Sequence, residues 1–100
     1  MMALEVFTPA RAQTTKMAVS STSARQALVA AYGQLRLWNP GPNTVYVEPG
    51  DSTVTANVNS SMPIPSGGME IITVSGWTHI AAIADAGMVG SLYLTPGDGV

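Results

Sequence analysis

The sequence predicts an all-β fold, a small antiparallel β-sandwich that is jelly-roll-like, with about seven to eight short strands and an extended N-terminal arm. Short segments in which apolar and polar residues alternate recur from Lys16 onward. Glycine, proline, asparagine or serine bounds each segment, as expected of turns. A chain of 100 residues is long enough for one compact domain. We therefore expect an arm at residues 1–15 and a single sandwich domain at residues 16–100.

The first fifteen residues show neither helical nor clean strand periodicity. Leu4, Val6 and Phe7 supply apolar side chains, and Arg11 and Lys16 supply positive charge. We expect this arm to reach a neighbouring protomer or a partner surface, where its apolar residues add contacts and its bases meet acidic groups.

Eight strand candidates follow the arm, each bounded by turn residues. In chain order they are KMAVS, ARQALVA, QLRLWN, TVYVE, STVTAN, MEIITVS, HIAAIA and SLYLT, at residues 16–20, 24–30, 34–39, 44–48, 52–57, 69–75, 79–84 and 91–95.

Alternation within these segments assigns the two faces of each strand. In QLRLWN, Leu35 and Leu37 fall on one side and Arg36 and Trp38 on the other. The aliphatic residues of TVYVE and SLYLT likewise oppose a tyrosine. We expect the aliphatic side to form the core and the outer faces to carry Arg36, Trp38, Tyr46 and Tyr93. A sheet face with large aromatics is usually covered by an arm, a loop or a partner.

One segment has two interpretations. SARQALVAAYG, residues 23–33, begins with a serine that could cap a helix, is rich in alanine and ends in glycine. A strand is favoured because the surrounding chain is patterned as strands, and AAYGQ can serve as the turn. Further along, prolines at 63 and 65 place residues 62–65 at a sheet edge or in a loop.

Composition narrows the classes of function. Charged residues make up 10% of the chain, against about 25% in typical globular proteins, and the net charge is −2. With 46% hydrophobic residues the chain is expected to fold. There is no cysteine, which excludes disulfides and thiolate metal sites. Four bases are too few and too scattered for nucleic-acid binding, and no apolar run is long enough to span a membrane.

The charges are unevenly distributed. All four basic residues lie in the first 36 positions, where Glu5 is the one acid, and the other five acids follow. A basic front and an acidic body can attract each other within one fold. Alternatively, the basic segment docks on a neighbouring subunit.

No catalytic or metal-binding group is evident. His79 is the single histidine, and the acids are scattered along the chain. The glycine-rich segments PSGGME and TPGDGV lack the phosphate-binding patterns and indicate turns. We expect no enzymatic activity, no metal and no cofactor. The aromatic residues, Trp38 and Trp77 among them, leave open a stacking platform for sugars.

Four segments carry a resemblance to a known group of proteins. They are LRLWNPGPNTVYVEPGDSTVTA, SMPIPSGGMEIITV, THIAAIA and SLYLTPGDG. Together they resemble small β-rich virion proteins of tailed bacteriophages over about residues 20–99; the arm lies outside the likeness. The matching positions are Arg36, Asn39, Gly41, Val45, Val47, Gly50, Asp51, Ser52, Met62 to Pro65, Glu70, Thr73, Thr78 to Ile83, Leu92 to Gly97 and Gly99.

The resemblance implies a structural role in the virion. A capsid decoration or cement protein is expected, made in the cytoplasm of the host bacterium and located on the capsid surface. Its expected partners are the major capsid protein and its own copies, with a trimer favoured, and neither nucleic acid nor membrane. Alternatives are a structural protein of the head–tail junction or fibre base, and a carbohydrate-binding adhesion module. The candidate interface residues are Leu4, Val6, Phe7, Arg11, Lys16, Arg36, Trp38, Tyr46 and Trp77.

Overall fold

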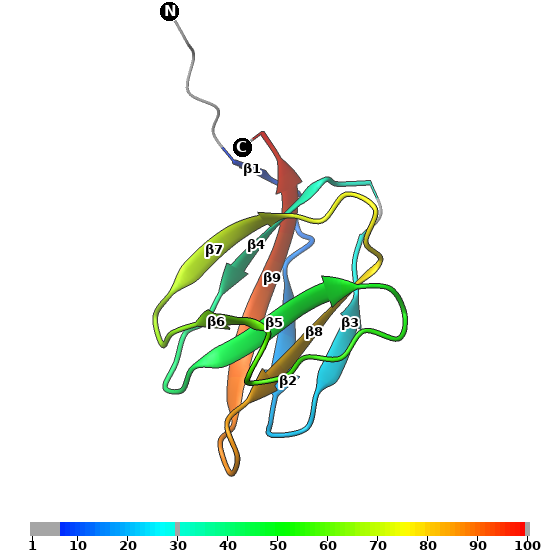
Figure 1. The fold of residues 1–100 in the computed structure, drawn as a ribbon. Helices are drawn as coiled ribbons and strands as arrows, with labels where there is room; N and C mark the ends of the chain where they lie inside the picture. Colours follow the sequence, from blue (N-terminus) through cyan, green and yellow to red (C-terminus); the bar gives the residue numbers. More distant parts are fainter. Residues whose placement is uncertain (1–6, 30, 100) are drawn as a thin grey trace, which may run out of the picture.

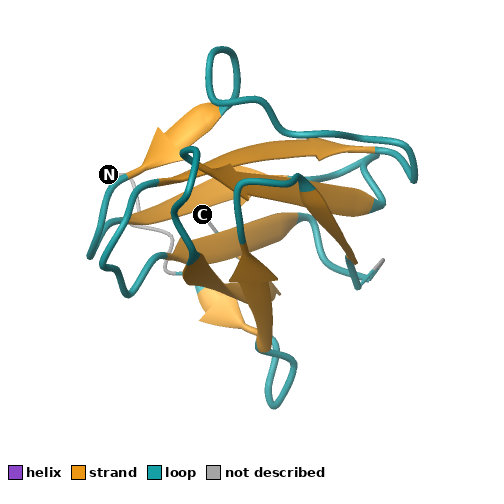
Figure 2. Cartoon of the chain, turned by 90° about the horizontal axis from the view of Figure 1, so that it is seen from below, coloured by secondary structure: helices purple, strands orange, loops and turns teal. Residues whose placement is uncertain are grey.

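The protein is an all-β sandwich in the computed structural model, which describes residues 7–29 and 31–99 (Figure 1). Its described part forms nine strands in two facing layers, with loops at their ends and flanks (Figure 2). The strands are β1 (Thr8–Pro9), β2 (Thr15–Val19), β3 (Ala24–Ala27), β4 (Gln34–Trp38), β5 (Val45–Gly50), β6 (Met62–Ile64), β7 (Met69–Thr73), β8 (His79–Ala84) and β9 (Gly90–Asp98).

The strand order is that of a jelly roll. Sheet 1 has the order β1-β9-β4-β7, with β2 also paired to β9, and sheet 2 has the order β3-β8-β5-β6. All pairings are antiparallel: β2 pairs with β9, β3 with β8, β4 with β7 and β5 with β6. This is the pattern of one long hairpin rolled into two sheets. The all-β, jelly-roll-like sandwich expected from the sequence is confirmed.

The core lies between the sheets and includes the aliphatic residues of QLRLWN, TVYVE and SLYLT that alternation assigned to it. Each fully buried Val, Leu or Ile side chain contributes about 1.5–3 kcal/mol relative to exposure. The buried cluster contains Met17, Val19, Leu35, Leu37, Val45, Val47, Ile64, Val74, Ile80, Ala82, Ala84, Leu92 and Leu94.

The strand boundaries agree with most of the expected segments. HIAAIA is β8 without a change of limits, and residues 24–27 form strand β3 where a helix was the alternative. The short strand β6 lies at an edge of sheet 2, as the prolines indicated. The predicted strand at residues 52–57 is wrong. Asp51 forms a turn there, because its carboxylate accepts hydrogen bonds from the N–H and hydroxyl of Thr53 and its carbonyl accepts from the N–H of Val54.

The described part of the expected arm lies against its own chain. Strand β1 pairs with the end of β9, and the N–H of Ala10 donates to the carbonyl of Pro96 over 2.7 Å. Gly97 permits this approach, since a Cβ there would collide with the Thr8 carbonyl and the Phe7 ring. Leu4 and Val6 lie outside the described residues. Contact of the arm with a neighbouring protomer stays a prediction.

The long connection between β5 and β6 covers the outer face of sheet 2, and in Figure 1 it passes in front of β8 and β3. It is anchored on the β3 side, where the N–H of Ala56 donates to Ser23 Oγ and Arg25 Nη1 donates to the carbonyl of Ser52. Ala81 points outward from β8 and is nevertheless fully buried. We call residues 51–61 the covering loop.

Candidate interaction face

A row of large side chains crosses the outer face of sheet 1. In the strand register Lys16 of β2 lies opposite Tyr93 of β9, Tyr93 lies opposite Trp38 of β4, and Trp38 lies opposite Met69 of β7. The neighbours of Lys16, Tyr93 and Trp38 along their strands include buried residues, and Met69 shares the register of Trp38, so all four side chains point outward. We call the outward surface of β2, β9, β4 and β7 the open face.

The aromatic pair at the centre of this row is ordered by direct contact. The rings of Trp38 and Tyr93 stack with centroids 5.3 Å apart and an interplanar angle of 29°. Lys16 Nζ lies 5.6 Å from the Tyr93 centroid, within the range of a cation–π contact. Stacking and cation–π attraction restrict the two rings before any partner binds.

A second row lies beside the first. Arg36 of β4 is opposite Thr95 of β9 and Ile71 of β7. Arg36 Nε donates a hydrogen bond of 2.8 Å to the sulfur of Met69, which directs the guanidinium toward the aromatic row. The hydroxyls of Thr14 and Thr95 are 2.9 Å apart and hydrogen-bonded. The face therefore combines aromatic, thioether, cationic and hydroxyl groups.

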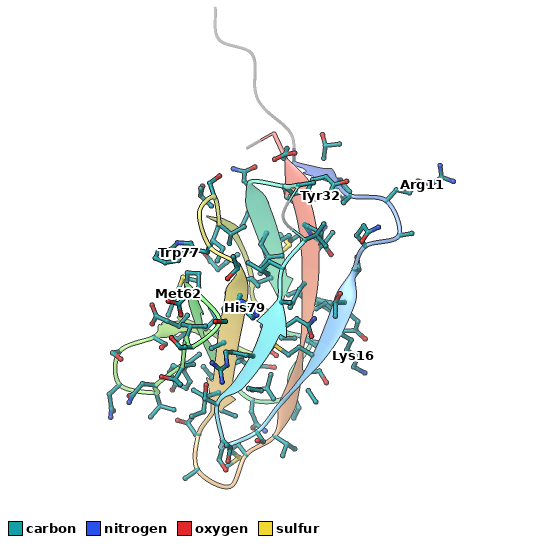
Figure 3. All side chains as sticks on the ribbon, turned by 90° about the vertical axis from the view of Figure 1, so that its right-hand side faces the viewer. Arg11, Lys16, Tyr32, Met62, Trp77 and His79 are labelled. Atoms are coloured by element: carbon teal, nitrogen blue, oxygen red, sulfur yellow. The ribbon has the colours of Figure 1, made fainter. Side chains whose placement is uncertain are left out.

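The open face is positively charged, although the chain carries a net charge of −2. Lys16 and Arg36 point outward, and no outward position of β2, β9, β4 or β7 holds an acid. Arg11 lies in the turn after β1, on the same side of the molecule as Lys16 (Figure 3). The acids of the described chain lie on sheet 2, in loops or at strand edges and ends: Glu48, Asp51, Glu70, Asp85 and Asp98.

Large apolar groups on this face remain in solvent. Trp38 is 42% and Met69 is 48% exposed. No described segment crosses them in the way that the covering loop crosses sheet 2. Contiguous exposed aromatic and apolar groups of this kind mark interaction sites in soluble proteins.

Three other predicted interface residues lie apart from this face. Tyr46 points outward from sheet 2, where burial and the neighbouring Asp85 carboxylate raise its pKa. Trp77 lies in the loop between β7 and β8, is 50% exposed, and lines an open pocket of about 460 Å³ with Tyr32. Phe7 packs near Gly97 at the base of the arm. The structure thus brings together Lys16, Arg36 and Trp38, and leaves Phe7, Tyr46 and Trp77 at separate places.

Sequence reasoning placed Tyr93 on an outer face and missed Met69. Alternation in MEIIT puts Met69 and Ile71 on one side, which was a usable signal. Their position beside Trp38 and Arg36 required the pairing of β4 with β7, which the sequence does not state.

The histidine and acidic side chains of the described residues do not gather into a metal-binding group. His79 Nδ1 is hydrogen-bonded to Thr78 Oγ1 at 2.8 Å. No group of three or more His, Cys, Asp or Glu residues within the described ranges could hold a metal ion. Nor do these ranges contain a helix of the length and apolar character that would cross a bilayer.

Comparison with known proteins finds no match for this chain. No protein-family model, curated protein or solved structure matches the chain.

Proposed function

We propose that this chain is a structural protein of a tailed-phage virion, a capsid decoration or cement protein that binds the major capsid protein through its open face. The observation that carries the proposal is the ordered row Lys16–Tyr93–Trp38–Met69 on an uncovered sheet. The part of the proposal that names a tailed-phage virion is supported by the resemblance of the turn and strand motifs to phage virion proteins. Catalysis has no part in this role.

The composition of the open face suits protein–protein docking. Tryptophan, tyrosine and arginine dominate the binding energy of interfaces, and methionine is enriched in them. Because the rings of Trp38 and Tyr93 are already stacked, less side-chain freedom is lost when a partner covers them. Lys16 and Arg36, with no acid on their face, favour a shell surface that presents carboxylates around an apolar patch.

The motif residues support a role in which the shape is held fixed. The buried Asn39 donates from Nδ2 to the carbonyls of Asn43 and Ile64, and its Oδ1 accepts from the N–H of Gly41, each over 2.8 Å. One side chain therefore ties the β4–β5 turn to β6. Self-association, with a trimer at local threefold positions of a shell, belongs to the same proposal and is supported by the resemblance alone.

The test is binding of the purified chain to particles assembled without it, measured by co-sedimentation. Trp38→Ala should weaken binding by roughly tenfold or more, the size of a hot-spot residue, and Met69→Ala by less. Higher salt should weaken binding because the bases contribute.

The chain supplies matched controls. Trp77→Ala and Met88→Ala remove side chains of equal type and similar exposure, 50% and 45%, outside the open face. They should leave binding unchanged. Equal losses for Trp38→Ala and Trp77→Ala would contradict docking through the open face. Binding to isolated tails instead of shells would support a location at the head–tail junction or fibre base.

The pocket at Trp77 favours a second candidate, a carbohydrate-binding adhesion module. Trp77 and Tyr32 supply aromatic surface, and Ser75 and Thr78 supply hydroxyls. Among the described residues, those that line the pocket include no carboxylate and no base, which suits a neutral sugar. Binding to a glycan array that is lost in Trp77→Ala and kept in Trp38→Ala would support this candidate. An array without signal would remove it.

A further inference from the structure

Three of the four sheet edges are blunted. The β1–β2 edge carries Pro9 and Lys16. Strand β6 is three residues long and contains Pro63. The four-residue strand β3 carries the exposed Arg25, whose guanidinium bonds to the covering loop. Proline, charge and short length all discourage pairing with another chain. The edge formed by β7 is different.

Strand β7 presents unpaired backbone groups to solvent. Among the described strands it pairs with β4 alone. The bond from the N–H of Val74 to the carbonyl of Gly33 shows that every second residue of β7, Glu70 and Ile72, bonds toward β4. The N–H and C=O groups of Met69, Ile71 and Thr73 therefore point outward from the sheet, ready to pair with an added strand.

A pocket of about 330 Å³ lies on the inner side of this edge, between β7 and sheet 2. Val47, Met62 and Ile72 give it apolar walls. Met62, labelled in Figure 3, comes from the sheet 2 side. Glu48 also lines the pocket, with its carboxylate oxygen accepting a hydrogen bond of 2.9 Å from Ser61 Oγ. Glu70 has the inward register on β7 and is exposed.

We propose that the β7 edge and this pocket bind an extended, basic and apolar peptide segment of a partner protein, which adds to sheet 1 as an antiparallel strand. Backbone pairing with Met69, Ile71 and Thr73 supplies affinity, and alternate side chains entering a pocket supply specificity. In antiparallel register, an apolar residue faces Ile72, and two positions later a Lys or Arg faces Glu70. This residue also approaches the rim on which Glu48 lies.

Charge placement selects this occupant over a second copy of β7. Antiparallel self-pairing centred on Ile71 would set each Glu70 opposite an Ile72 of the other copy. Each carboxylate would lose solvent without gaining a cation, which is unfavourable. A basic segment neutralises the same carboxylate. The proposal does not depend on the open face or on the proposed role in a virion.

The experiment titrates the full ¹⁵N-labelled chain with three short capped peptides and follows amide shifts by NMR. The first, TVTLTKTVT, carries the apolar-x-Lys pattern; the second replaces its lysine with glutamate. The third is the first peptide N-methylated at the threonine between leucine and lysine, which blocks pairing opposite Ile71. The first should shift amides of β7 and of residues 47, 48 and 60–62. Affinity should fall at least roughly tenfold for each of the other two.

Variants of the chain locate the contact. Ile71→Pro removes an outward N–H and leaves the bonds to β4, so it should abolish binding, whereas Ile71→Thr keeps the N–H and should bind. Glu70→Gln should reduce the preference for lysine over glutamate. If Ile71→Pro fails to fold, the N-methylated peptide provides the same test.

Three outcomes would overturn the proposal. They are no shift with TVTLTKTVT at millimolar concentration, shifts confined to another edge, and equal binding of the N-methylated peptide. A dimer that Ile71→Pro dissociates would assign the edge to a second copy instead.

Discussion

The outer faces of the two sheets differ in what lies over them. Under the covering loop, sheet 2 has small outward residues, Gly50 and Ala81, and both are buried. Sheet 1 carries Trp38 and Tyr93 in the same outward positions of its strands and has no such cover in the described chain. Alternation treats the two faces alike. Whether an outward residue is core or surface depends on where the loops run.

The largest expected effect tests this difference with one residue type. Ala81 on β8 and Ala18 on β2 both point outward, but Ala81 is fully buried and Ala18 is exposed. Ala81→Asp should cost about 4 kcal/mol of unfolding free energy, because its carboxylate would lose water under the loop. Its neighbours there are the carboxylate of Glu48 and the guanidinium of Arg25, which is already bonded to the Ser52 carbonyl. Ala18→Asp should cost less than about 1 kcal/mol. Urea denaturation of both variants measures this, and equal losses would show that the loop does not seal the face.

A smaller loss should follow when the covering loop is released from its anchor. Ser61 Oγ accepts from the N–H of Asn57 and donates to Glu48. Ser61→Ala leaves both groups without this partner and should cost about 1–3 kcal/mol. The Asn57 amide should exchange faster in hydrogen-exchange measurements. Ser60→Ala, at the exposed neighbour, is the control and should change stability by less than about 0.5 kcal/mol.

On the open face, removing the largest side chain should barely affect folding. Trp38 is half-exposed and stacks on Tyr93, a contact that contributes about 0.5–1.5 kcal/mol. Trp38→Ala should therefore lower stability by about 1 kcal/mol, as measured by thermal denaturation. A loss near that of Ala81→Asp would mean that the tryptophan is part of the core and not a docking residue.

The smallest effect concerns pH and the start of the covering loop. Hydrogen bonds from the hydroxyl and N–H of Thr53 hold the pKa of Asp51 below its usual value of 3.8, and the charges of His79 and Arg25 add to this. A lowered folded-state pKa gives stability that is fully present above the unfolded value and is lost as pH falls through the folded value. The stability difference between wild type and Asp51→Asn should be constant down to about pH 5 and vanish in stronger acid. A difference that grows on acidification would contradict this sign.

Much of the fold could be predicted from local pattern, and the candidate face only in part. Alternation identified the core residues Leu35, Leu37, Val45, Val47, Leu92 and Leu94 and the outward Arg36, Trp38 and Tyr93. It failed at residues 52–57, where TVTA has strand propensity but Asp51 turns the chain with its own side chain. Propensity is weaker than a satisfied turn.

What the sequence could not supply was the pairing of distant strands. Lys16, Tyr93, Trp38 and Met69 form one row because β2, β9, β4 and β7 are neighbours. They are widely separated in the chain, and their spacing contains no sign of the row. The structure explains two of the motif residues by local geometry. The side chain of Asn39 holds the turn by accepting a hydrogen bond from Gly41, and Gly41 adopts a positive φ of 99°.

The rolled hairpin also determines when the protein can complete its fold. Strand β2 has its partner in β9, the last of the described strands, so sheet 1 cannot close during synthesis until Gly90–Asp98 has left the ribosome. Pairing between distant segments carries a loop-closure cost that local pairing avoids, and such β-sandwiches fold in about milliseconds to seconds. Until then the edge of β4 that will pair with β9 has no partner strand. The faster new chains accumulate, the more often the incomplete sheets of two chains collide before β9 pairs.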